Sequence, residues 1–231
     1  MAGRARREIL SEIRLRESAP ADRAGHGARG EQARVALLVD RAPGEARALY
    51  VFAHGAGGHR ADRAMQALAP RLAALGLDVA RFDFPYRRDG RRIPDRLPVL
   101  QAALAEAVAQ ARAQSGARRL LLGGRSLGGR VATLLAAAGF ACDGLLLFAY
   151  PLHPQGKPGR LRDAHLPAIR VPVFCVNGTR DPLCRRDLME GVLKTVGAPW
   201  RMRWLEGAGH SFDDLPDGLL DEIGEWSAAP R

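Results

Sequence analysis

The sequence predicts one α/β domain built around a mostly parallel β-sheet. Short apolar runs alternate with segments in which apolar residues recur at helical spacing. Strands that are apolar on both faces and separated by helices are typical of parallel sheets with right-handed crossovers. With 231 residues, of which 47% are hydrophobic, the chain is long enough to bury one full core.

The apolar runs predict buried strands along the whole domain. They are Val35 to Val39, Ala48 to Ala53, Leu77 to Phe82, Leu120 to Gly123, Leu145 to Phe148, Val171 to Val176 and Arg201 to Leu205. No helical pattern separates the first two runs, and residues 41–45 include Pro43 and Gly44, which favour a tight turn. We therefore expect a hairpin here, so that the sheet begins with an antiparallel N-terminal strand.

The segments of helical spacing predict the helices between these strands. In the first, Met65, Leu68 and Leu72 share one face with Leu75, and Gly76 marks the helix end. The others contain Leu100, Leu104, Val108 and Ala111; Val131, Leu134, Leu135 and Ala138; Leu188, Val192 and Val196; and Leu219, Leu220, Ile223 and Trp226. In such sheets functional groups collect just past the carboxyl ends of the strands.

The first 33 residues differ from the rest of the chain. They are polar and rich in Ala, Gly and Arg, which predicts a basic, flexible arm at 1–33 followed by a single domain at 34–231. The chain shows neither a secretory signal nor an apolar run long enough to span a bilayer. Its three cysteines are an odd number without metal-ligand spacing, so we expect a reduced, cytoplasmic protein.

The net charge of +10 raises the question of nucleic acid binding. However, the arginines are spread along the chain, and aromatic residues make up only 6% of it, which argues against a base-stacking surface. A nucleic acid partner would predict binding with a steep salt dependence.

The most informative motif is the Gly-x-Ser-x-Gly pentapeptide from Gly124 to Gly128. It lies between a predicted strand and a predicted helix, where small residues allow a very tight turn that exposes the hydroxyl of Ser126. A serine nucleophile needs a base, and the base needs an orienting acid. Asp181 and His210 each follow a later strand, in the order Ser, Asp, His that this motif requires. Taken singly, Asp181 is also explained as a turn residue and His210 as a solvated loop residue.

Acyl transfer also requires donors for the oxyanion. The backbone N–H of Leu127, directly after the serine, is one candidate, and the N–H of Ala56 in the glycine-rich loop His54 to Gly58 is the other. The competing interpretation of this loop is a phosphate cradle, but it lacks the Lys-Ser or Lys-Thr ending and the Gly-x-Gly-x-x-Gly spacing. His54 itself is expected to shape the loop through backbone hydrogen bonds.

Taken together, these motifs resemble the small lidless α/β-hydrolases. The dienelactone-hydrolase-like branch is the most similar, and within it the subgroup of NSL-complex-subunit and testis-expressed hydrolase-like proteins. The resemblance covers roughly residues 35–226, and the motifs that carry it are His54-Gly55-Ala56-Gly57-Gly58, Arg81-Phe82-Asp83-Phe84-Pro85-Tyr86, Gly124-Arg125-Ser126-Leu127-Gly128-Gly129, Tyr150-Pro151-Leu152-His153-Pro154 with Gly156-Lys157-Pro158, Gly178-Thr179-Arg180-Asp181-Pro182, and Gly209-His210.

The resemblance implies a three-layer α/β/α sandwich and assigns the roles of nucleophile, acid and base to Ser126, Asp181 and His210. It also implies that Ala56 and Leu127 form the oxyanion hole. Dienelactone hydrolases proper carry a cysteine nucleophile, so Ser126 argues against that activity. The resemblance therefore implies a reaction class and leaves the substrate open.

Two basic segments follow predicted strand ends. One runs from Arg87 to Arg96, and the other contains Lys157. They are expected either to rim the site, with Arg87, Arg88 and Lys157 favouring an anionic substrate, or to be solvated loops. The Pro- and Gly-rich stretch around Lys157 is too short for a helical lid, which predicts an open, shallow site.

The expected function is therefore a serine hydrolase of small ester or acyl substrates, acting through an acyl-enzyme without metal or organic cofactor. A peptidase or thioesterase of the same fold remains open, as does an interaction protein that keeps the fold without turnover. The partner is a small-molecule substrate, and the protein is expected to be a monomer or homodimer that does not bind membranes.

Overall fold

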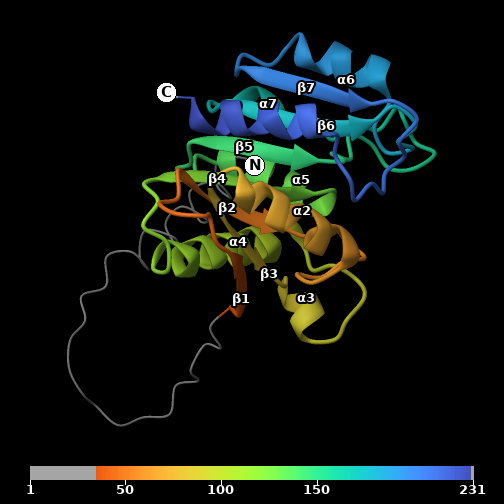
Figure 1. Cartoon of the computed structure of the whole chain (residues 1–231). Coiled ribbons are helices and arrows are strands. Elements are labelled where there is room, and N and C mark those ends of the chain that lie inside the picture. The colour runs from red at the N-terminus through yellow and green to blue at the C-terminus, as the bar shows by residue number, and fades with distance from the viewer. Residues whose placement is uncertain (1–34, 230–231) are drawn as a thin grey trace.

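A computed structural model describes residues 35–229 and contains a seven-stranded sheet (Figure 1). The strand order across the sheet is β1-β3-β2-β4-β5-β6-β7. The bounds are β1 Leu37–Asp40, β2 Ala48–Ala53, β3 Leu77–Phe82, β4 Arg119–Arg125, β5 Gly144–Phe148, β6 Val173–Gly178 and β7 Trp200–Leu205. The strands from β2 to β7 are parallel, and only β1 runs antiparallel to its neighbour. The mostly parallel sheet with an antiparallel N-terminal strand is thus confirmed.

The predicted hairpin between the first two strands is wrong. β1 pairs with β3, where Leu37 lies opposite Phe82, and β2 lies between β3 and β4. Every residue of β2 is buried, so both edges of this strand must be paired inside the sheet. β1 is only partly buried, which suits it to the sheet edge.

Helices cover both faces of the sheet, as the predicted three-layer sandwich requires (Figure 1). Residues of α4, α5 and α6 share one core with one face of the sheet, and residues of α2 and α7 share a second core with the other face. The bounds are α2 Arg63–Ala74, α3 Pro85–Arg88, α4 Leu97–Arg112, α5 Leu127–Ala137, α6 Arg186–Leu193 and α7 Asp217–Ala228. The expected face of α2 is confirmed, since Met65, Leu68 and Leu72 are fully buried. Gly76 follows this helix with φ of 90°, a conformation that favours glycine.

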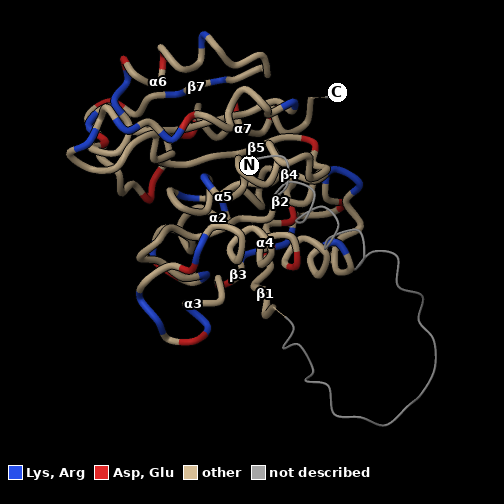
Figure 2. Tube along the Cα trace, turned by 180° about the vertical axis from the view of Figure 1, so that it is seen from behind, with Lys and Arg blue, Asp and Glu red and all other residues tan. Residues whose placement is uncertain are grey.

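The connections carry the departures from the expected elements. The short helix α3 was not expected, and basic and acidic positions are interleaved along the chain that follows it (Figure 2). Between β5 and β6 the only regular structure within the described residues is the three-residue 3-10 helix η1, Leu166–Ala168. The predicted arm at 1–33 lies outside the described residues. Within 35–229, no helix is both long and apolar enough to cross a bilayer.

Candidate active site

Ser126 occupies a sharp corner between β4 and α5. Its φ of 48° and ψ of −110° are unusual for a residue with a side chain, and such strain persists only where the surrounding structure enforces it. The flanking glycines make this corner possible. A Cβ atom on Gly124 would lie 2.1 Å from the carbonyl oxygen of Ala53, and one on Gly128 would lie 2.3 Å from the same oxygen. The motif therefore reflects the close approach of this corner to the end of β2.

The structure brings His210 and Asp181 to this corner. His210 Nε2 lies 2.8 Å from Ser126 Oγ, and His210 Nδ1 lies 2.9 and 3.0 Å from the two carboxylate oxygens of Asp181. An ionised carboxylate only accepts hydrogen bonds, so Nδ1 of His210 must carry the proton that it donates to Asp181. In the neutral ring, Nε2 is then free to accept the hydroxyl proton of Ser126.

The carboxylate of Asp181 is held by several hydrogen bonds. Its side chain is completely buried, and it accepts hydrogen bonds from the backbone N–H of Leu183 at 2.8 Å and from Asn177 Nδ2 at 3.3 Å. The same Asn177 amide also bonds both the N–H and the C=O of Tyr150, at 3.0 and 3.1 Å. Asn177 thus ties the end of β5 to the loop that carries Asp181.

The loop that carries His210 is packed against the acid loop. A Cβ atom on Gly178 would lie 2.1 Å from the carbonyl oxygen of Ala208, so only glycine lets the two loops approach this closely. The N–H of Arg180 donates to the same oxygen at 2.9 Å. Arg125 adds a contact from the other side, because its guanidinium donates to the carbonyl of His210 at 3.3 Å.

The glycine-rich loop after β2 lies directly against the serine. A Cβ atom on Gly55 would be 3.6 Å from Cβ of Ser126. The carbonyl of Gly55 is held by His54 Nδ1 at 2.7 Å and by the N–H of Gly58 at 3.0 Å. Because a trans peptide is planar, fixing this carbonyl also fixes the N–H of Ala56 on the opposite side of the same peptide. No acceptor among residues 35–229 takes up the N–H of Ala56.

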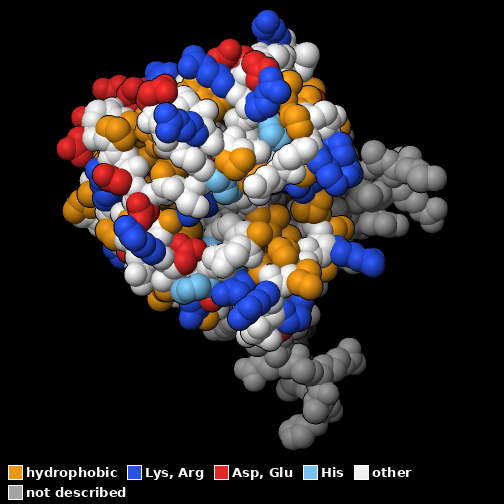
Figure 3. Space-filling view, turned by 90° about the vertical axis from the view of Figure 1, so that its right-hand side faces the viewer, with side chains coloured by type: hydrophobic (Ala, Val, Ile, Leu, Met, Phe, Trp, Pro, Cys, Tyr) orange, Lys and Arg blue, Asp and Glu red, His pale blue; other side chains and the backbone are white. Residues whose placement is uncertain are grey.

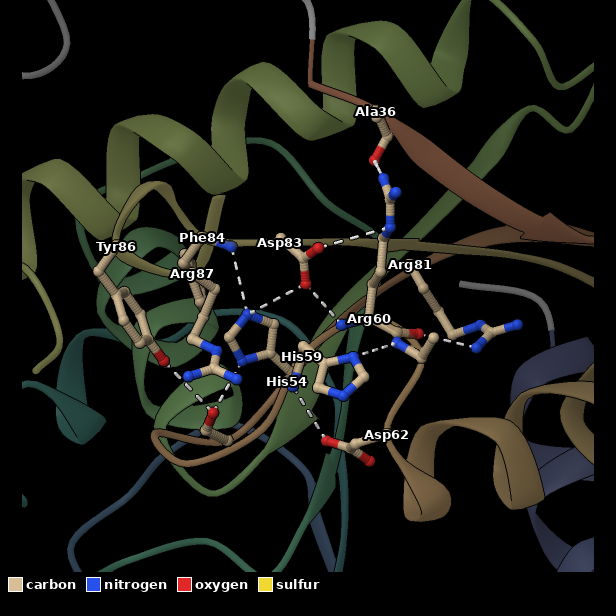
Figure 4. Close-up of polar contacts among 12 residues, drawn as sticks. Ala36, His54, His59, Arg60, Asp62, Arg81, Asp83, Phe84, Tyr86 and Arg87 are labelled. Atoms are coloured by element: carbon tan, nitrogen blue, oxygen red, sulfur yellow. Dashed lines mark hydrogen bonds and ion pairs between the residues drawn. The ribbon is translucent and has the colours of Figure 1, made fainter. Parts of the chain in front are cut away.

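His54 is fixed as a neutral ring. Its Nδ1 faces the carbonyl of Gly55 and must donate, while its Nε2 accepts the N–H of Phe84 at 3.2 Å (Figure 4). The ring is fully buried, and burial lowers its pKa below the ordinary value of 6.5. The expected loop-shaping role of His54 through backbone hydrogen bonds is thus confirmed. Tyr86 adds a second support, since its hydroxyl donates to the carbonyl of Ala56 at 2.9 Å.

The three predicted rim residues, Arg87, Arg88 and Lys157, lie in different surroundings. Arg87 lies beside His54, and its Nε is buried without a hydrogen-bond partner among the described residues (Figure 4). Arg88 and Lys157 are exposed, and no contact within 35–229 joins their side chains to Ser126 or His210. The carboxyl edge of the sheet, seen in Figure 3, carries basic side chains together with several histidines and acidic groups.

Two supporting residues were not assigned a role from the sequence. Tyr86 belongs to a motif that was recognised, but its bond to Ala56 depends on how α3 folds over the loop. Asn177 stands directly before Gly178 at the end of a predicted strand, which is a position where functional groups collect. Within the described residues, no cluster of three or more His, Cys, Asp or Glu side chains could hold a metal ion.

Known proteins with the same architecture match this chain. A family model described as an α/β hydrolase domain matches residues 46–220. An α/β serine hydrolase homologue from Coxiella burnetii is 19% identical with a TM-score of 0.67, covering 91% of this chain and 98% of that chain. A dienelactone hydrolase from Anabaena variabilis is 19% identical with a TM-score of 0.65, covering 86% of this chain and 91% of its own.

A third structure, a lidless α/β serine hydrolase from Xanthomonas campestris, is 22% identical with a TM-score of 0.64 and coverages of 83% and 85%. At these identities the structures show a shared fold. The expected resemblance to lidless and dienelactone-hydrolase-like proteins is confirmed at this level, whereas the NSL-complex-subunit subgroup stays a prediction. Because the family model spans well over half of its residues, the chain belongs to the α/β hydrolase domain family.

Proposed function

We propose that this protein is a serine hydrolase of small ester or acyl substrates. The observation that carries the proposal is the continuous chain of hydrogen bonds from Ser126 through His210 to Asp181, with lengths of 2.8 and 2.9 Å. A hydroxyl is a weak nucleophile at neutral pH, and a base oriented by a buried carboxylate is the arrangement that activates it.

In the proposed reaction, His210 Nε2 takes the proton of Ser126 as the serine oxygen attacks the substrate carbonyl. The N–H groups of Ala56 and Leu127 stabilise the tetrahedral oxyanion, each contributing about 3 kcal/mol to the lowering of the barrier. The proton then passes from His210 to the leaving alcohol, and the acyl group remains on Ser126. Water, deprotonated by His210, releases the acid and restores the serine.

The open carboxyl edge supports small substrates. The connection from β5 to β6 contributes only η1 as regular structure, so no helical lid of described residues covers the serine. Such an edge does not favour an interfacially activated lipase. Peptidases commonly rely on an additional domain that restricts access, and the described residues supply none.

A fluorophosphonate probe tests the proposal, because it reacts covalently with activated serines. We expect labelling of the wild-type protein and its loss in Ser126→Ala. The matched control is Ser211→Ala, since Ser211 is an exposed serine next to His210 and should not be required. Absence of labelling in a folded wild-type protein would support a scaffold that keeps the fold without turnover.

The acyl and alcohol preference follows from a screen of p-nitrophenyl esters, thioesters and lactones. We further propose that Arg87 favours anionic esters, because its partly buried guanidinium lies beside the candidate oxyanion loop. Arg87→Gln should then lower kcat/KM for an anionic ester more than for a neutral one. Arg91→Gln is the control, as Arg91 is already paired with Asp89 and Asp95 at 3.0 and 2.7 Å.

A further inference from the structure

A pocket away from the candidate active site lies between α5 and the β5–β6 connection. Its volume is about 570 Å³, and its polar side chains are Arg130 from α5 and Arg160, Arg162 and His165 from the connection. Ser126, Asp181 and His210 do not line it. Three arginines therefore line one cavity, and the charges of Arg130 and Arg160 are close enough to act on Arg162.

These arginines have no acidic partner. Among the described residues, no carboxylate forms an ion pair with Arg130, Arg160 or Arg162, although many other arginines of the chain are paired. The Nε atom of Arg130 is buried and has no hydrogen-bond partner within 35–229. Asp163 is close enough to influence His165, but it does not pair with any of the three arginines. A buried donor without a partner is costly, which points to an acceptor that the polypeptide does not supply.

The positive charges also act on one another. Burial lowers the pKa of Arg162, and the charges of Arg130 and Arg160 lower it further. Burial, together with the charge of Arg130, lowers the pKa of His165 to about 4, so this ring is neutral at pH 7. The Thr133 hydroxyl lies 2.9 Å from His165 Nε2 and donates to the carbonyl of Arg130 at 2.8 Å, so the neutral ring is held by donating to Thr133. The site thus places like charges close together, and a bound anion would offset their repulsion.

We propose that this pocket binds the phosphoryl group of a small molecule through Arg130, Arg160 and Arg162. A phosphate monoester carries up to two negative charges and three terminal oxygens, which suits several guanidinium forks better than a single carboxylate does. The cavity exceeds the size of the bare ion, and Leu134 and Leu161 offer apolar surface for the rest of the ligand. This inference does not depend on the proposed hydrolase activity.

The test is an isothermal calorimetric titration of the full-length protein with inorganic phosphate and with glycerol 3-phosphate. Both titrations use a chloride buffer at constant ionic strength. We expect saturable binding that is weakened about tenfold or more in Arg130→Gln and in Arg162→Gln. Arg92→Gln is the matched control, because it removes the same charge from an exposed arginine that forms no ion pair with any residue in 35–229, and it should bind as the wild type does. Arg160→Gln covers the case in which a variant at Arg130 or Arg162 does not fold, since Arg160 is exposed.

Three results would overturn the proposal. They are the absence of saturable binding to the wild type, equal weakening by Arg92→Gln, and succinate binding as tightly as the phosphate ligands. Ser126→Ala should bind phosphate normally, so failure of the hydrolase proposal and failure of this one can be told apart.

Discussion

Two buried histidines, His54 and His153, are held in the same way at different places. Each donates from Nδ1 to the carbonyl of the residue that follows it, which is Gly55 for His54 and Pro154 for His153. Each accepts a backbone N–H at Nε2 at 3.2 Å, from Phe84 and from Arg185. Only His54 thereby orients a peptide that faces Ser126. The pair therefore separates a purely structural role from a role in positioning the oxyanion donor.

This contrast makes a prediction at the level of single residues. His54→Ala and His153→Ala should each lower the free energy of unfolding by about 2 kcal/mol, because each removes a buried ring and the hydrogen-bond partner of a backbone N–H. His54→Ala should in addition lower kcat for p-nitrophenyl acetate by about 10- to 100-fold, through a displaced Ala56 N–H. His153→Ala should leave kcat within about threefold. Urea unfolding and steady-state kinetics measure the two effects, and equal kcat losses would contradict the assigned role.

The glycines of the nucleophile corner give a second residue-level prediction. Gly128→Ala should destabilise the protein by about 1–3 kcal/mol in urea unfolding, since its Cβ would meet the Ala53 carbonyl oxygen at 2.3 Å. The control is Gly191→Ala in the last turn of α6, where a Cβ meets nothing within 4 Å. That change should be stabilising by about 0.5–1 kcal/mol, because alanine favours the helix. A neutral outcome for Gly128→Ala would show that the corner can open.

At the level of elements, the ends of β5 and β6 are joined by one side chain. Asn177 is fully buried. It forms two hydrogen bonds with Tyr150 and one with Asp181. The position of the loop that carries Asp181 therefore depends in part on the end of the neighbouring strand β5.

Asn177→Ala is expected to lower the free energy of unfolding by about 2–3 kcal/mol, because the buried N–H and C=O of Tyr150 lose their partner. It should also lower kcat, because Asp181 loses one donor. Thr179→Ala, two residues further along and bonded to Gly207 and Glu206, should cost about 1 kcal/mol or less. Thermal or urea unfolding of both variants, beside their kcat values, checks the comparison. A larger loss for Thr179→Ala would contradict it.

The elements also show what could be predicted from the sequence. β2 and β3 match the expected bounds at both ends, because apolar runs with clear flanking breaks are a local signal. The partner of β1 could not be predicted, because the choice between β2 and β3 depends on which strand is buried on both edges of the sheet. The meeting of Ser126, Asp181 and His210 at one edge of the sheet could be predicted because each follows its own strand. The pocket lined by Arg130, Arg160 and Arg162 could not be predicted, because it exists only once the β5–β6 connection folds against α5.

At the level of the whole molecule, the arginines behind the net charge of +10 do not all have the same effect. Many arginines form surface ion pairs, such as Arg203 with Glu222 at 2.6 Å, and pairs of this kind contribute little to stability. Burial and the charge of Arg130, which forms no ion pair with any described residue, instead lower the pKa of His165 and so affect how the folded protein responds to acid.

His165 makes that response measurable. The pKa of His165 is about 4 in the folded protein, whereas a histidine in an unfolded chain has the ordinary value of 6.5. Between these two pH values the unfolded chain binds a proton that the folded chain does not. The stability associated with the neutral ring is complete above about pH 6.5 and is lost as the pH falls towards 4. Between pH 7.5 and pH 4.5, the advantage of the wild type over His165→Gln in unfolding free energy should shrink by about 2 kcal/mol. Urea unfolding of both proteins in phosphate-free buffer measures it, and a constant difference would contradict the assignment.

The order of strands β4, β5, β6 and β7 in the sheet is also their order in the chain, and this has a consequence for synthesis. Ser126 leaves the ribosome first, Asp181 follows β6, and His210 comes only after β7, close to the end of the 231 residues. In the proposed mechanism, the nucleophile is therefore synthesised well before His210, the base proposed to activate it. We therefore expect the growing polypeptide to be unreactive towards acyl compounds until β7 and the loop that carries His210 have been made and docked.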